Sequence, residues 1–162
     1  MTTNSDGAPA GRDFSGLARV AFRVVGGLHN GIYRATDGRV VGRLMGSPVL
    51  LLTTTGRRTS KERTSPLLYL EEGGNLVVVA SMGGARRHPA WYLNLVASGE
   101  AQVRVGDRTL RVKAEEVRGE EKRRLWARLV EMYPPYESYQ LRTRREIPVV
   151  ALRPVAEERA AS

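Results

Sequence analysis

The stretch VLLLTTTGRRTSKERTSPLLYL, residues 49–70, contains the pattern on which the predicted fold rests. Residues 49–55 are a continuous run of apolar and β-branched side chains, and Gly56-Arg57-Arg58 stops it. A second run of strand-forming residues follows at 63–70. We therefore expect two neighbouring strands joined by a polar and strongly basic connection.

The same texture continues along the chain. A loop around 42–48 precedes the first strand, and the run EEGGN at 71–75 makes a turn after the second. Gly106-Asp107 suits a tight hairpin, and Pro154 ends the last strand. Further strands are expected at 76–81, 101–105, 109–117 and 147–152. About six short strands with turn-length links predict a mainly β, α+β fold built on a small antiparallel barrel.

Helices are expected between the strands, at 89–97, 120–133 and 136–142. A fourth, N-terminal amphipathic helix is expected at 14–33, where apolar residues recur at steps of three and four and arginines flank the stripe. Two interpretations of this helix stay open. It packs on its own domain, or it lies on an anionic membrane surface with its arginines toward the headgroups.

Length and composition restrict the classes of protein. The 162 residues suffice for one domain, expected at 14–155, between a polar lead-in at 1–13 and a tail at 156–162. Cysteine is absent and only two histidines occur, so disulfides, thiolate chemistry and a protein-borne metal are not expected. Without a signal sequence or a run of 18 apolar residues, we expect a cytoplasmic protein, at most peripheral to the membrane.

The net charge of +9 arises almost wholly from arginine, because only three of the 26 basic residues are lysine. A basic balance favours anionic partners, which include nucleic acid, an anionic membrane and a small polyanionic cofactor. Composition alone does not choose among these three.

Residues 53–64 are the first candidate site. Arg57, Arg58, Lys61 and Arg63 lie within seven residues around a glycine turn, with hydroxyl side chains between them. The planar guanidinium fork suits phosphate and carboxylate oxygens. The GxxxxGK[ST] pattern of a nucleotide P-loop is absent. This segment is an anion site or a solvated basic hairpin.

Residues 80–91 are the second candidate site. A strand ends at Ser81, passes through Met82 and the paired glycines Gly83-Gly84, and enters a helix after His88. Glycines let a backbone approach a ligand closely, and Trp91 can supply an aromatic wall. The alternatives are a helix-capping or core role for the histidine and core packing for the tryptophan.

Tyr133, Tyr136 and Tyr139 form the third candidate site, because their spacing places them on one flank if the segment is helical. They would cover a flat aromatic ligand or form a packed aromatic corner. A hydrolase is not indicated, since no GxSxG motif occurs.

Together, residues 48–95 and the later run YPPYESYQLRTRREIPVVALRP resemble the deazaflavin-dependent nitroreductase family. The resemblance covers about residues 45–155 and implies an FMN-binding-like split β-barrel that uses reduced coenzyme F-420. Members pass a hydride from this deazaflavin to quinones, nitroaromatics or enones. A menaquinone-like acceptor would suit the amphipathic N-terminus.

The resemblance also implies residue roles. Arg57, Arg58 and Arg63 match contacts to the phosphate and glutamate tail of the coenzyme. The residues that match contacts to the deazaflavin ring are Ser81, Met82, Gly83, Gly84, His88 and Trp91. Those that match the acceptor side are Leu68, Tyr133, Tyr136 and Tyr139, with Ser81 and Tyr133 nearest the chemistry. Met82 and Leu68 depart from residues usual in the family, which weighs against nitro-drug activation.

Two other functions remain open from the sequence. One is a split barrel that binds FMN or haem, or that only sequesters the coenzyme. The other is a nucleic-acid-binding barrel, although the tyrosines lie apart from the basic hairpin and no RNP-like motif occurs, so no nucleic-acid partner is expected. The oligomeric state is left open.

Overall fold

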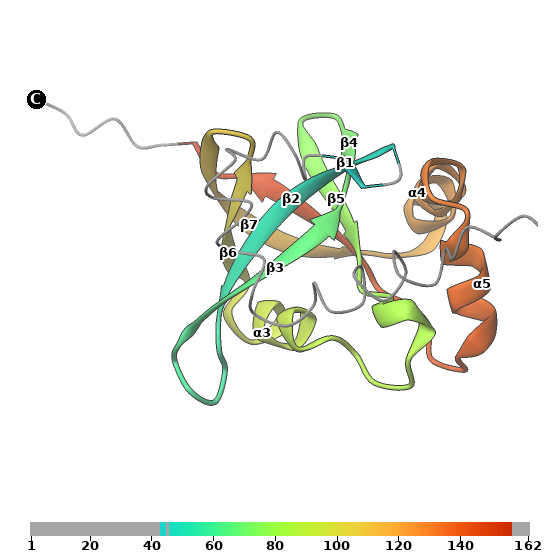
Figure 1. Cartoon of the computed structure of the whole chain (residues 1–162), viewed down its shortest axis with the longest axis horizontal. Helices are drawn as coiled ribbons and strands as arrows, with labels where there is room; N and C mark the ends of the chain where they lie inside the picture. The colour runs from blue at the N-terminus through green and yellow to red at the C-terminus, as the bar shows by residue number, and fades with distance from the viewer. Residues whose placement is uncertain (1–42, 45, 157–162) are drawn as a thin grey trace, which may run out of the picture.

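The computed structural model describes residues 43–44 and 46–156. The predicted helix at 14–33, the lead-in and most of the tail lie outside the described residues. Eight strands are present: β1 (Arg43–Leu44), β2 (Ser47–Thr55), β3 (Glu62–Leu68), β4 (Leu70–Glu72), β5 (Asn75–Val79), β6 (Glu100–Val105), β7 (Arg108–Val117) and β8 (Val149–Pro154). They form one curled antiparallel sheet (Figure 1).

The sheet closes because one chain segment pairs on two sides. The strand path runs β1-β2-β6-β7-β8-β5-β4, and β3 pairs with β2. Only Tyr69 separates β3 from β4, and its amide donates to the carbonyl of Pro48 at 3.2 Å. The segment 62–72 therefore acts as one bent strand that joins β2 to β5. Counted this way the barrel has the expected six strands, and the short strand β1 is an addition where a loop was predicted.

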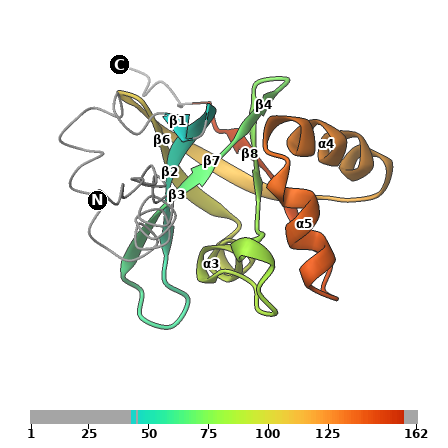
Figure 2. The ribbon, with the colours of Figure 1, turned by 45° about the vertical axis from the view of Figure 1, so that its right-hand side comes forward.

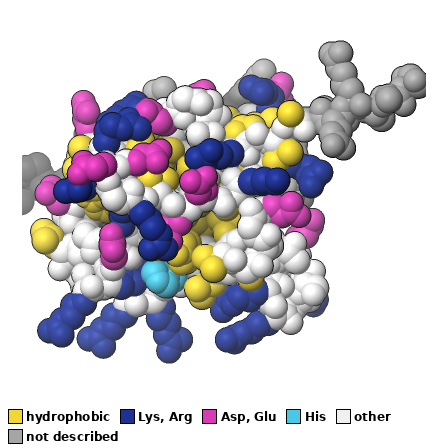
Figure 3. Space-filling view, turned by 180° about the vertical axis from the view of Figure 1, so that it is seen from behind, with side chains coloured by type: hydrophobic (Ala, Val, Ile, Leu, Met, Phe, Trp, Pro, Cys, Tyr) yellow, Lys and Arg dark blue, Asp and Glu magenta, His cyan; other side chains and the backbone are white. Residues whose placement is uncertain are grey.

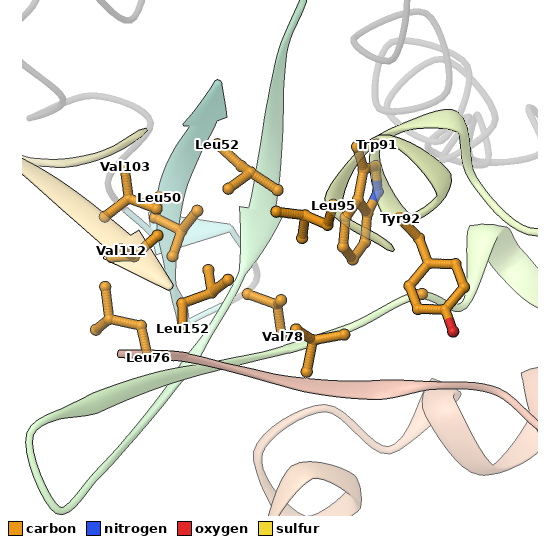
Figure 4. Close-up of a cluster of buried hydrophobic side chains, with 12 residues drawn as sticks. Leu50, Leu52, Leu76, Val78, Trp91, Tyr92, Leu95, Val103, Val112 and Leu152 are labelled. Carbon is orange, nitrogen blue, oxygen red and sulfur yellow. The ribbon is translucent and has the colours of Figure 1, made fainter. Parts of the chain in front are cut away.

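Alternate residues of β5 and β8 face two apolar layers, as the two-residue period of a strand requires. Val78 and Leu152 point into the barrel, whereas Val77 and Val149 face outward. The interior cluster is completed by residues of β2, β6 and β7 and by Trp91, Tyr92 and Leu95 of α3 (Figure 4). The outer cluster includes Leu125 and Leu129 of α4 and Tyr136 of α5. The apolar run of β5 is thus buried on both faces.

The three later helices fall where they were predicted. They are α3 (Ala90–Ser98), α4 (Gly119–Met132) and α5 (Pro135–Arg142). In place of a simple glycine turn, a short 3-10 helix η1 (Met82–Gly84) follows β5. Figures 1 and 2 show α3 at one end of the barrel and α4 and α5 together on one side of the sheet. Among the described residues, no helix is long and apolar enough to cross a membrane.

Candidate functional site

The basic connection between β2 and β3 is a hydrogen-bonded turn whose cationic side chains are exposed. The Gly56 amide donates to the Lys61 carbonyl, and the Ser60 amide donates to the Gly56 carbonyl, both at 2.8 Å. A Cβ at Gly56 would lie 2.6 Å from Thr59 Oγ1 and 3.1 Å from the Lys61 carbonyl oxygen, so glycine lets this turn close without displacing either group. We call residues 56–63 the arginine hairpin. Within the described part of the chain, Arg58, Lys61 and Arg63 are exposed and form no ion pair.

Asn94 of α3 attaches the arginine hairpin to the barrel. Its Oδ1 accepts from the Arg57 backbone amide at 3.2 Å and from Arg57 Nη1 at 3.3 Å. Its Nδ2 donates to Thr54 Oγ1 at 3.1 Å. Asn94 and Thr54 are both buried, so their polar atoms need these partners. Sequence reasoning gave Asn94 no role, because its partner Arg57 lies 37 residues away along the chain.

The end of β5 and the loop after it hold the second group of predicted residues. Ser81 is buried, and its hydroxyl makes no hydrogen bond to any residue that the structure describes. Met82 is 54% exposed and has a φ of 45°, a conformation that non-glycine residues rarely adopt. Gly83 has a φ of 64° and open space beside its Cα. The backbone at Met82–Gly83 is therefore accessible to a ligand.

Glycine is needed at position 84 for helix packing. A Cβ at this position would lie 2.5 Å from the carbonyl oxygen of Tyr139 and 3.1 Å from Arg142 Cβ. The glycine thus permits α5 to pack directly against η1. This contact brings the loop after β5 beside the tyrosine-bearing helix, although the two segments are about 55 residues apart in sequence.

Arg145, which sequence reasoning did not single out, holds the same loop. It lies between α5 and β8, and its guanidinium donates to the carbonyl oxygens of Ala80, Ser81 and Ala85 at 2.8–3.2 Å. Arg145 Nη1 also lies 3.3 Å from Nδ1 of His88. No local pattern could have indicated these contacts, because the partners are 57–65 residues away.

His88 is half-buried at the entrance to α3. Its ring lies 4.8 Å from the ring of Tyr92, whose hydroxyl donates to Glu116 Oε1 at 3.1 Å. Burial, and then the charge of Arg145, lower the pKa of His88, while Glu116 opposes them. A lowered histidine pKa means that the ring is neutral at physiological pH.

The three predicted tyrosines do form one cluster. The ring centroids of Tyr133 and Tyr136 are 4.9 Å apart, and Tyr139 lies 6.3 Å from each. The hydroxyls of Tyr133 and Tyr139 are 3.2 Å apart and share a hydrogen bond. Burial, and then this bond, raise the pKa of Tyr133 to about 12. Leu68 of β3 packs in the same apolar layer, so the predicted acceptor-side residues are brought together.

Trp91 is placed differently from the other ring-site candidates. It is 8% exposed and belongs to the barrel interior, where its ring lies edge-on to Tyr92 at 6.4 Å. It therefore packs in the core, which is one of the two roles expected for it. A contact between Trp91 and the deazaflavin ring of a coenzyme remains a prediction.

The three groups lie along one edge of the molecule. In Figures 1 and 2 the arginine hairpin, α3 and the loop after β5 follow each other along the lower edge, with α5 at the far end. Lys and Arg side chains project from this edge (Figure 3). Within residues 43–44 and 46–156, no group of three His, Asp or Glu side chains could hold a metal ion. The edge can thus bind an anion at one end and a flat group beside the tyrosines at the other.

A sequence profile of F-420H(2)-dependent quinone reductases matches residues 27–154 of the chain. The protein belongs to this family. An F-420H(2)-dependent quinone reductase of Mycobacterium tuberculosis is 43% identical over 129 residues, which cover 77% of this chain and 87% of that protein.

Two solved structures are also similar to this chain. One, an F-420-H2 dependent reductase called FDR-A, is 44% identical with a TM-score of 0.60 and covers 65% of this chain and 93% of its own. The other, described as a domain-swapped dimer, is 39% identical with a TM-score of 0.61 and covers 76% and 98%. The predicted split β-barrel fold and family resemblance are confirmed.

Proposed function

We propose that this protein reduces a quinone with electrons from reduced coenzyme F-420, bound along the edge that joins the arginine hairpin to the tyrosine cluster. The observation that supports this assignment most is the group of exposed cations Arg58, Lys61 and Arg63, which form no ion pair with any residue that the structure describes. Asn94 attaches their hairpin to α3, the helix that begins just after the loop that follows β5. Exposed guanidinium groups without carboxylate partners suit the phosphate and glutamate tail of that coenzyme.

The described residues fit the coenzyme at both ends. Arg57, Arg58 and Arg63 would hold its anionic tail. Ser81, Met82, Gly83, Gly84 and His88 would line the deazaflavin ring, with Trp91 beneath them. Ser81 is buried and its hydroxyl has no partner among residues 43–44 and 46–156, which supports this placement, because a buried polar group normally has a hydrogen-bond partner.

When bound, the reduced coenzyme supplies the hydride, so the chain itself must position, orient and exclude water. Tyr133, Tyr136 and Tyr139 would form an apolar wall with Leu68 against which a quinone ring packs. With a pKa of about 12, Tyr133 keeps its proton at neutral pH and can donate a hydrogen bond to an acceptor oxygen as charge develops there. Ser81 would donate from the other side.

The first test is a fluorescence titration of the protein with oxidised F-420, with FMN as the control ligand. We expect micromolar or tighter binding that is selective over FMN. Arg58→Glu should weaken it about a hundredfold, because it replaces an attraction worth about 1.5–3 kcal/mol with a repulsion. The matched control is Arg108→Glu, which makes the same charge change at the exposed first residue of β7. Equal losses in the two variants, or preference for FMN, would contradict the assignment.

The second test addresses the acceptor side with a soluble naphthoquinone. Ser81→Ala and Tyr133→Phe should each lower kcat/KM by about tenfold or more, since each removes one donor to the developing charge. Tyr133→Phe should leave the affinity for F-420 within a few-fold of the unsubstituted protein, whereas Ser81→Ala should also weaken that affinity, because Ser81 is placed beside the deazaflavin ring. If both variants keep full kcat/KM, these two roles are wrong.

The finer proposal is that the acceptor is a lipid-soluble, menaquinone-like quinone reached at the inner face of the cell membrane. It is supported by the sequence of residues 14–33, in which arginines flank an apolar stripe. Deleting residues 1–30 should abolish binding to anionic liposomes and spare reduction of the soluble quinone. Retained liposome binding would contradict it. Reduction of nitroaromatics or enones is a further expectation, tested in the same assay.

A further inference from the structure

Arg145 is a half-buried cation that contacts four groups of one loop. Nε donates to the Ala85 carbonyl at 2.8 Å, and Nη2 donates to the Ser81 carbonyl at 2.8 Å. Nη1 donates to the Ala80 carbonyl at 3.2 Å and lies 3.3 Å from His88 Nδ1. Each nitrogen of the guanidinium thus contacts a different part of the segment after β5. Nη1 and Nη2 contact its start, at Ala80 and Ser81, and Nε contacts Ala85, just after η1.

No carboxylate among the described residues balances the charge of Arg145. Among the ion pairs of the described residues, none involves Arg145, and its partners are backbone carbonyls and an imidazole. Three donors that diverge in one plane are a property of guanidinium, whereas a lysine ammonium presents its donors from a single atom. The contacts therefore require the shape of arginine as well as its charge.

The same contacts decide the tautomer of His88. A guanidinium has donors only, so Nδ1 must offer its lone pair to Arg145 Nη1. A neutral imidazole carries one proton, which is then on Nε2. The ionisable groups around this ring are Arg145, Tyr92 of α3 and Glu116 of β7, and the burial and Arg145 effects that lower its pKa outweigh Glu116.

We propose that Arg145 is a positioning residue of the coenzyme-ring site, where it fixes the shape of residues 80–88 and holds His88 as the neutral tautomer protonated on Nε2. This inference rests on the proposed function of that loop. Arg145 does not itself line the ring site in this role. It acts through the carbonyl of Ser81, which orients the hydroxyl of that residue, and through His88, whose Nε2–H becomes a fixed donor.

The direct measurement uses the protein without coenzyme. The chain has two histidines, so His29→Gln leaves His88 as the single signal in a two-bond 1H–15N correlation of 15N-histidine-labelled protein. At pH 7 we expect a protonated Nε2 and an unprotonated Nδ1. A spectrum of the Nδ1-protonated tautomer, or an even mixture, would overturn the proposal without need of any variant at Arg145.

Variants in the same background separate shape from charge. In Arg145→Met both tautomers should appear, and the His88 titration midpoint should move up toward its ordinary value of 6.5. In Arg145→Lys the midpoint should stay low while the tautomers mix, because the charge remains and the fork is lost. The matched control is Arg144→Met, an exposed neighbour without a contact to the loop among the described residues, and it should leave both signals unchanged.

The affinity for F-420 tests whether the contacts of Arg145 matter for coenzyme binding. Arg145→Met should bind oxidised F-420 at least tenfold more weakly than Arg144→Met, with far-UV circular dichroism confirming that both are folded. Equal affinities, or unchanged His88 signals in folded Arg145→Met, would overturn the role of Arg145. Absence of F-420 binding by the unsubstituted protein would instead overturn the proposed function, so the two failures are distinguishable.

Discussion

The arginine hairpin and the tyrosine cluster lie at opposite ends of one edge of the molecule. The hairpin presents exposed cationic side chains, whereas the tyrosines are packed in an apolar layer. The hairpin exposes Arg58, Lys61 and Arg63 and is attached to the barrel through Asn94. The tyrosines are packed against each other, with Tyr136 only 5% exposed in the outer apolar layer. Substitutions in the hairpin should therefore change ligand binding with little cost in stability, whereas substitutions in the cluster should change both.

Tyr136→Ala should show the largest effect on stability. Its ring packs between Tyr133, at 4.9 Å, and Trp126, at 6.3 Å, so truncation leaves a cavity worth about 3–5 kcal/mol. The measurement is urea unfolding, with Tyr136→Phe as the control that keeps the ring and should cost about 1 kcal/mol or less. A loss in Tyr136→Ala no greater than that of Arg58→Glu would remove the contrast between the two ends.

Gly84→Ala tests the contact that joins α5 to η1 in the loop after β5. The new Cβ meets the Tyr139 carbonyl at 2.5 Å and the residue must keep a φ of 81°, so we expect a loss of about 2–4 kcal/mol. Gly83→Ala is the matched control, because it has a φ of 64° and nothing near its Cβ. Gly83→Ala should lower the free energy of unfolding by about 1–2 kcal/mol, which is the cost of holding an alanine in the left-handed backbone conformation. Equal losses in urea unfolding would show that α5 does not press on η1.

Asn94→Ala should show that the hairpin, too, has one structural support. Removing the amide leaves Thr54 Oγ1 and the Arg57 amide without a partner, at a cost of about 1–3 kcal/mol. We also expect about fivefold weaker F-420 binding, because Arg57 loses its anchor. Thr54→Val should cost stability but spare that affinity. A double-mutant cycle with both changes should give a coupling energy near 1 kcal/mol, and strict additivity would contradict the shared network.

The smallest expected effect is on the pH dependence of stability. A folded-state pKa of about 12 for Tyr133, against 10 in the unfolded chain, means that its contribution to stability is complete below pH 10 and is lost as pH rises from 10 to 12. Tyr133→Phe should therefore lose less stability over this alkaline range, measured by urea unfolding at pH 9 to 11.5. An identical decline would assign the effect to Tyr136, whose pKa burial also raises.

Much of this architecture could be predicted because it is local. Strand alternation, the Gly106-Asp107 turn and the spacing of the tyrosines are each contained within a few neighbouring residues. The short strand β1 is local too, since it pairs with the start of β2, but its two residues are too few to show a strand pattern. The break at Tyr69 could not be predicted, because it depends on how the sheet closes. Asn94 and Arg145 were missed for the same reason. Their partners are brought together only by tertiary structure, and neither residue type marks a site without them.

The position of β8 has a consequence for how the chain folds. This strand lies between β5 and β7, with Val150 paired to Val78 on one side and to Glu116 on the other. The hairpins β2–β3 and β6–β7 can form as they leave the ribosome, whereas β5 can pair only with β4 until β8 is synthesised. We therefore expect nascent chains that stop before residue 149 to expose an apolar strand edge, where chaperones bind and aggregation begins.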